Sequence, residues 1–143
     1  MYMAVPLSRY IVAKCVQDGC PISNLQLQKI LYYVQKEFLK SGSPAFSDDV
    51  EAWQFGPVVP SVYFRFCGFG AMPITFCGDN EKPVQLSSMD QIVIDRIVEE
   101  KRTLPPWDLV EETHKPGGAW DKVYHNGEGN HKVIPNDLIK EIG

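Results

Sequence analysis

The sequence predicts a mainly helical α+β fold, a single compact domain of about five to six helices with a small β patch of two or three strands. Two segments, 24–40 and 87–102, carry apolar residues at helical spacing behind capping residues. Between them, segment 50–55 alternates in the way a short strand does. The length of 143 residues is that of one domain, spanning 1–143.

Two helices are predicted at the start of the chain. For the first, 6–18, Pro6 suits an opening turn and Gly19 a left-handed stop. For the second, 24–40, Ser23 and Gln26 form a capping-box pattern. Its apolar residues fall on one face: Leu27, Ile30, Leu31, Val34 and Phe38.

The next segments change character. Residues 50–55 predict a short strand, which we expect to end at Gly56-Pro57 because proline has no N–H to give to a ladder. Pro60 then suits the first turn of a short helix that runs to residue 66. A glycine- and proline-rich stretch follows, and residues 84–86 are a second candidate strand that would pair with the first.

The C-terminal half predicts one long helix and three short ones. In 87–102, Ser88 and Gln91 repeat the capping pattern, and the residues expected to face inward are Met89, Ile92, Val93 and Ile97. Leu104 precedes Pro105, so the helix ends there. Short helices are predicted over 106–114, 119–125 and 134–143.

Composition excludes several classes of function. The net charge is −4 and no block of Lys or Arg occurs, so direct nucleic-acid binding is not expected. No apolar run approaches the roughly 18 residues that cross a bilayer. Four cysteines at spacings unlike a zinc knuckle or redox pair predict reduced thiols in a cytoplasmic protein. We expect neither a metal nor a cofactor, because the sequence has no H-E-x-x-H, no Cys/His spacing of a metal site, and no G-x-x-x-x-G-K-[ST] or G-x-G-x-x-G loop.

One histidine suggests an enzyme as an alternative. His114 ends a predicted short helix. A hydrolase could use this histidine together with a carboxylate such as that of Asp121. A histidine that caps or packs explains the same position, and no partnered nucleophile is visible. We therefore predict no catalytic residue, with a hydrolase that uses His114 as the alternative.

Three sequence blocks resemble one known family. They are "NLQLQKILYYVQ" (24–35), "EAWQFGPVVPSVY" (51–63) and "THKPGGAWDKVY" (113–124). In this order and spacing they resemble the Panacea domain, also described as SocA-like or phage-associated proteins, over residues 5–142. The matching positions, which we interpret as mainly structural, are Leu27, Lys29, Leu31, Trp53, Gly56, Pro57, Val58, Pro60, Tyr63, Thr113, His114 and Trp120.

The resemblance implies an antitoxin of a bacterial or prophage toxin–antitoxin pair that neutralises a small protein toxin by direct contact. It also implies an alternative, an adaptor that delivers the bound toxin to a AAA+ protease. The family has no established catalytic residues. Two departures stand out: an aromatic run, "FRFCGFG", after Tyr63, and "PGGAW" before the helix predicted at 119–125.

The aromatic residues suggest where a partner binds. An exposed apolar and aromatic patch is what a protein interface requires. Our candidates for contact with a toxin are Tyr32, Tyr33, Phe64, Phe66, Phe69 and Phe76. Trp53 and Phe55 lie on one face of the predicted strand, and we interpret the Gly56-Pro57 corner as mainly architectural, fixing that strand against the helix of Tyr32 and Tyr33. The alternative is an exposed aromatic contact site at this corner.

Overall fold

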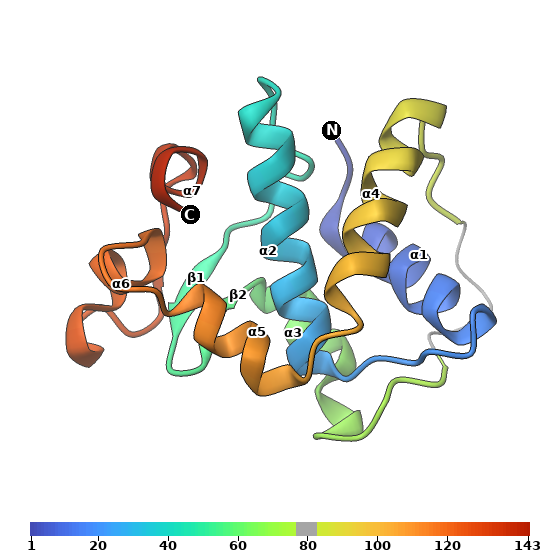
Figure 1. Cartoon of the computed structure of the whole chain (residues 1–143), viewed down its shortest axis with the longest axis horizontal. Coiled ribbons are helices and arrows are strands. Elements are labelled where there is room, and N and C mark those ends of the chain that lie inside the picture. Colours follow the sequence, from blue (N-terminus) through green and yellow to red (C-terminus); the bar gives the residue numbers. More distant parts are fainter. Residues whose placement is uncertain (77–82) are drawn as a thin grey trace.

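The computed structural model describes residues 1–76 and 83–143. In this part of the chain, seven α-helices and a small three-stranded antiparallel sheet form a mainly helical domain (Figure 1). The helices are α1 (Ala4–Gln17), α2 (Asn24–Lys40), α3 (Pro60–Phe66), α4 (Ser88–Lys101), α5 (Pro106–Thr113), α6 (Ala119–Tyr124) and α7 (Asn136–Ile142). The strands are β1 (Glu51–Trp53), β2 (Gly56–Val58) and β3 (Lys132–Val133), and short 3-10 turns lie at η1 (Cys67–Phe69) and η2 (His125–Gly127).

Helix α2 is the central element of the fold. It contacts α1, α3, α4, α5, α7 and β2, and Figure 1 shows it between α1 and α4 on one side and α6 and α7 on the other. The predicted capping box is confirmed, because the Ser23 side chain accepts from the backbone N–H of Gln26 at 3.3 Å. The Gln26 side chain in turn accepts from the backbone N–H of Ser23 at 3.0 Å.

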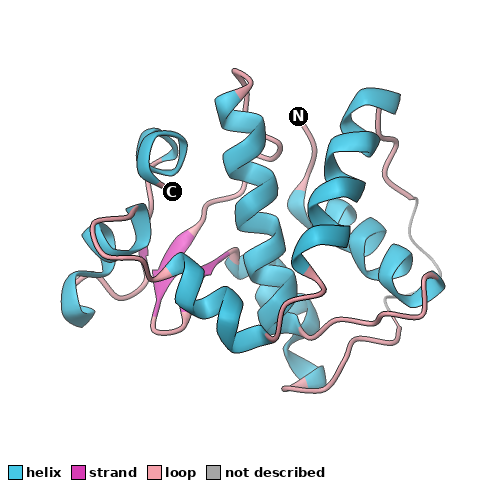
Figure 2. Cartoon of the chain, in the orientation of Figure 1, coloured by secondary structure: helices cyan, strands magenta, loops and turns pink. Residues whose placement is uncertain are grey.

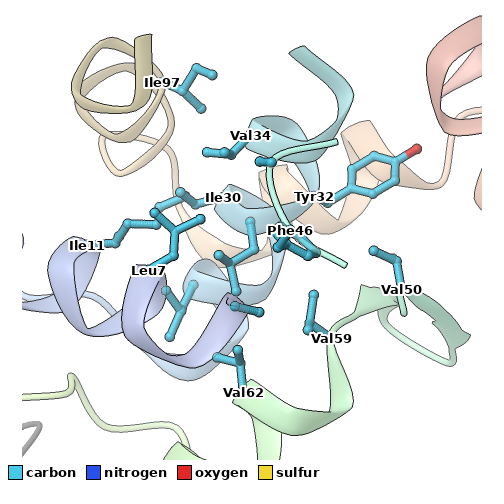
Figure 3. Packing of buried hydrophobic residues seen from close by; sticks show 14 of the residues in the cluster. Leu7, Ile11, Ile30, Tyr32, Val34, Phe46, Val50, Val59, Val62 and Ile97 are labelled. Atoms are coloured by element: carbon cyan, nitrogen blue, oxygen red, sulfur yellow. The ribbon is translucent and has the colours of Figure 1, made fainter. Parts of the chain in front are cut away.

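The hydrophobic core surrounds this helix (Figure 3). Leu7 and Ile11 of α1 pack beside Ile30 of α2, and Ile97 enters from α4. Phe46 is fully buried although it lies in the connection between α2 and β1. Among the described helices, none is long and apolar enough to cross a membrane.

Buried polar side chains of α2 hold the chain that follows it. The Gln35 side chain accepts from the backbone N–H of Ala45 at 2.8 Å and donates to the Phe46 carbonyl at 2.9 Å. Gln28 accepts from the backbone N–H of Val59 at 2.9 Å and donates to Asn24. Buried amides need such partners, so these glutamines position the loop before β1 and the entry to α3.

The sheet corrects two predictions from the sequence (Figure 2). Its order is β2-β1-β3, so Pro57 lies within an edge strand, opposite Ala52. A proline is tolerated there because the Ala52 carbonyl accepts instead from the backbone N–H of His131, at 2.7 Å. The second partner of β1 is β3, whereas residues 84–86 form no strand.

Helix α4 presents a different face from the one predicted. Its cap is Ser87 rather than Ser88, and Ser87 accepts from the backbone N–H of Asp90. The residues buried on α4 are Ile94, Ile97 and Val98. Met89 and Ile92 are exposed, so their predicted inward orientation is wrong, and Val93 is half-buried. Ile97 alone of the four predicted inward residues is fully buried, because the side of α4 that meets α2 runs through Ile94 and Val98.

The remaining predicted helices are confirmed with shifted ends. Helix α1 begins at Ala4, two residues before Pro6, and α7 runs from Asn136 to Ile142, with Gly143 as its C-cap. Helices α3 and α5 begin at their predicted prolines, Pro60 and Pro106. The described part of the chain thus has seven helices, where five or six were expected.

Candidate functional site

The three sequence blocks meet at the turn between β1 and β2. Lys29 reaches this turn from α2, and its Nζ donates to the Pro57 carbonyl at 3.0 Å. The Lys29 side chain is fully buried and has no carboxylate partner within the described residues. Burial alone lowers the pKa of Lys29 from 10.5 to about 7, because a charged amine loses its hydration there. At neutral pH much of this amine is therefore uncharged.

Gly56 separates Lys29 from α5. Its φ of +114° is in the region that favours glycine. A Cβ at this position would lie 2.8 Å from Lys29 Cε and 2.9 Å from Thr113 Oγ1. The turn therefore has room for no other residue, because neighbouring atoms occupy that space on both sides.

The third block clamps the same turn from α5 and α6. Trp120 Nε1 donates to the Trp53 carbonyl at 2.8 Å. The His114 ring lies on Trp120, with centroids 3.6 Å apart and an angle of 5° between the planes. Burial, with Lys29 nearby, lowers the pKa of His114, although its bond to the backbone of Phe55 opposes this change. His114 is therefore a neutral packing group at neutral pH.

The geometry does not pair His114 with Asp121. Asp121 Oδ2 accepts from the backbone N–H of Gly117 at 2.9 Å, and its charge is the smallest of the four influences on the pKa of His114. His114 Nε2 is buried and has no hydrogen-bond partner in the described part of the chain. Within residues 1–76 and 83–143, no group of three or more His, Cys, Asp or Glu side chains is placed to hold a metal ion. Cys15, Cys20 and Cys67 are free thiols, and Cys77 lies outside the described residues.

An aromatic pocket opens beside the β1–β2 turn. Its volume is about 500 Å³, and we define it by the side chains that line it most prominently: Trp53, Phe55, Tyr63, Trp107 and His131. Trp53 packs edge-on against Tyr63 at 4.9 Å and stacks on His131 at 4.4 Å. Phe55 packs edge-on against Trp107 at 5.4 Å. The walls of this pocket thus come from β1, the following turn, α3, α5 and the loop before β3.

The wall residues are held in place by the backbone and by polar contacts. The Trp53 ring donates from Nε1 to Glu51 at 2.9 Å. His131 has a φ of +69°, which is uncommon outside glycine, and its backbone N–H is fixed on β1. Residues in uncommon backbone conformations persist only where the surrounding structure holds them, and they cluster at binding and active sites.

The six aromatic residues predicted to contact a partner have different environments. Tyr32 and Phe66 are buried in the core, which corrects their prediction as contact residues, because they have no surface to offer. Tyr33 is half-buried: its hydroxyl donates to Glu112 at 2.7 Å, and Lys101 Nζ lies 4.1 Å from its ring centroid. Phe69 is half-buried, and Phe64 and Phe76 are exposed.

The other family positions lie near the turn or in the core. Leu27 and Leu31 are fully buried, and Val58 is nearly so. Pro60 begins α3, and Tyr63 follows in the same helix as a pocket wall. Trp107 and His131 were missed by the sequence reasoning; the signal for Trp107 was a large aromatic residue beside the proline that starts α5.

Comparison with known proteins identifies the family. Residues 27–121 match the family described as "Antitoxin SocA-like, Panacea domain". The chain belongs to this family. It is also 37% identical over 135 residues to "Antitoxin SocA" of Caulobacter vibrioides (strain NA1000 / CB15N), an alignment that covers 86% of this chain and 70% of the relative. No solved structure matches the chain.

The match confirms the resemblance drawn from the three sequence blocks. The Panacea family is one of antitoxins and not of enzymes, so the antitoxin function predicted for this chain is supported by both the family and the relative. An antitoxin implies a cognate toxin as its partner. The hydrolase alternative built on His114 is set aside, because neither the family nor the geometry around His114 supports it.

Proposed function

We propose that this chain neutralises a small protein toxin by direct binding, and that the face around the aromatic pocket makes the contact. One observation carries the location: large aromatic side chains gather there and remain accessible. Trp107 is 61% exposed and packs edge-on against Phe55, which is also exposed. Phe64 is 64% exposed and its ring lies beside that of Trp53.

The composition of this face suits a protein partner. Tryptophan and tyrosine dominate the energy of protein interfaces because they bury a large area at a small entropy cost. A standard interface takes about 800 Å² from each partner, so exposed residues such as Phe64 extend the contact beyond the pocket itself. Tyr33 bonds to Glu112 of α5 and remains a candidate for the edge of the toxin contact.

Co-expression with the adjacent open reading frame tests this proposal. We expect the neighbour's product to arrest growth alone, to be harmless beside this chain, and to co-purify with it as a stable complex. A neighbour that is not toxic, or one that is rescued without forming a complex, would contradict direct neutralisation.

Masking and delivery to a AAA+ protease share this contact and differ in the fate of the toxin. Masking leaves the toxin intact, whereas an adaptor shortens its life. We propose masking as the primary activity, in the cytoplasm, where Cys15, Cys20 and Cys67 are expected to stay reduced. Measuring the toxin half-life with and without this chain separates the two: an unchanged or longer half-life indicates masking, and a shorter one indicates delivery.

A further inference from the structure

We propose that the aromatic pocket receives a short stretch of toxin backbone carrying one large, uncharged apolar side chain. This inference rests on the proposed function, because it names the chemistry of the segment that the toxin would insert. The volume of about 500 Å³ is that of a small-ligand or side-chain site rather than a packing defect.

The walls favour an apolar side chain. Trp53, Phe55, Tyr63 and Trp107 present ring faces and edges to the cavity. Trp53 is held on both sides, by Tyr63 and by His131, so little freedom remains to be lost when a ligand enters. Rings that are already fixed in the free protein bind a ligand more tightly. Their conformational entropy is lost on folding and is not lost again on binding.

The charge of the pocket argues that its occupant is neutral. Among the described residues of the lining, none is Asp or Glu. Its single lysine, Lys29, has a pKa lowered by burial, and its amine is covered by Gly56 and bonded to the Pro57 carbonyl. The Glu51 carboxylate, which accepts from the Trp53 ring, is not among the described lining residues. A charged side chain entering here would lose its hydration without meeting an opposite charge in the described lining, which is unfavourable.

Two amides at the pocket are available for a peptide backbone. Gln54 and Asn130 line the opening and are exposed, and neither side chain has a hydrogen-bond partner in the described residues. Asn24 and Gln28, by contrast, bond within the fold, to the Tyr63 carbonyl, to each other and to the backbone N–H of Val59. An inserted segment thus meets an apolar interior and two free amides.

A nucleotide fits the same rings less well. Stacked aromatic residues also bind bases, but such sites add cationic side chains for the phosphates. The described lining residues include one cationic group, the buried Lys29 amine, and the whole chain has a net charge of −4. The observations therefore favour a peptide, and nucleotide binding becomes one outcome of the test.

The first test measures toxin binding by calorimetry with the full chain and the product of the adjacent reading frame. We expect Trp107→Ala to raise Kd by about tenfold or more, as loss of a hot-spot tryptophan does. The matched control is Ile92→Ala on α4, since Ile92 is 66% exposed but lies outside the pocket; it should stay within about twofold of the wild type. Absence of wild-type binding contradicts the proposed function, whereas wild-type binding that Trp107→Ala leaves unchanged overturns only the pocket.

The second test determines whether the toxin side chain that enters the pocket is charged. Gln54→Glu and Gln54→Lys place opposite charges at an exposed position of the turn, so neither disturbs the core. A neutral occupant predicts that both variants change Kd in the same direction, to values within about threefold of each other. A gain in affinity for one variant and a loss for the other overturns the inference, because it indicates a charged side chain. Competition by a nucleoside triphosphate, with the toxin displaced, overturns it as well.

Discussion

Lys29 and Gly56 are in contact so close that no side chain fits between them. A Cβ on Gly56 would meet Lys29 Cε at 2.8 Å, and the Lys29 amine reaches past the glycine to the Pro57 carbonyl at 3.0 Å. Thr113 closes the other side of the glycine, with its hydroxyl 2.9 Å from the same Cβ position. The three sequence blocks, 24–35, 51–63 and 113–124, are therefore held together by direct contact at this turn.

Gly56→Ala should destabilise the fold. An alanine would have to adopt a φ of +114° and displace Lys29 or Thr113, and strain and overpacking together cost about 3 kcal/mol. Chemical denaturation measures the change. Gly68→Ala is the control, because no atom of the described residues lies within 4 Å of a Cβ there; an equal loss in both variants would show that the contact at Gly56 is unimportant.

Lys29 should make stability depend on pH. Its pKa falls from 10.5 to about 7 on folding, so between these values the unfolded chain binds more protons than the folded one. The cost of burying the lysine is complete below about pH 7 and absent above about 10.5. The free energy of unfolding should therefore rise with pH across this window, by up to about 1.4 kcal/mol per unit.

Lys29→Met separates this effect from other titrations. Methionine fills a similar volume without a titratable group, so the rise between pH 7.5 and 9.5 should disappear. Urea denaturation at several pH values gives the comparison. Lys40→Met, at an exposed position on the same helix, should keep the wild-type rise; a variant at Lys29 that keeps it too would refute the buried neutral amine.

The elements that the sequence predicts well are those decided by near neighbours. Ser23 and Gln26 are three residues apart and their side chains satisfy each other's backbone, so the start of α2 was visible. The partner of β1 was not: Lys132 pairs with Ala52 across 80 positions, and no local pattern encodes that pairing. Pro57 misled for a related reason, since an edge strand is recognised only once its neighbours are known.

The candidate site was predicted only in part. The family blocks pointed to Lys29, Gly56 and Thr113, but their meeting at one turn depends on how α5 packs on β2. Phe66 and Phe64 are two residues apart in one helix, yet one is buried and the other exposed. Aromatic composition alone cannot distinguish them, because the difference lies in which face of α3 meets α1.

The capping box of α2 offers a test of local stability. Ser23→Ala removes the hydroxyl that accepts from the backbone N–H of Gln26, and we expect a loss of about 1 kcal/mol. Thermal or urea unfolding measures it. Ser43→Ala serves as the comparison, because its side chain is exposed and makes no hydrogen bond to any described residue; a loss no larger at Ser23 than at Ser43 would contradict the role of the cap.

Substitution of His114 distinguishes a structural role of this residue from a catalytic one. His114→Ala removes a ring stacked at 3.6 Å on Trp120, so stability should fall by about 1 kcal/mol. Toxin neutralisation should persist in cells under conditions where the variant stays folded, because the ring supports the turn and does no chemistry. Asp121→Asn should also neutralise the toxin, since that carboxylate bonds the backbone N–H of Gly117 and not the imidazole.

The readout that decides this point compares toxin rescue with folding in the same variants. If His114→Ala and Asp121→Asn both abolish rescue while circular dichroism and toxin binding stay at wild-type levels, the two residues act on the toxin chemically. Rescue that falls only in proportion to the folded fraction supports the structural role. The second outcome follows from the geometry, because His114 stacks on Trp120 and Asp121 bonds the backbone of Gly117, and neither lines the aromatic pocket.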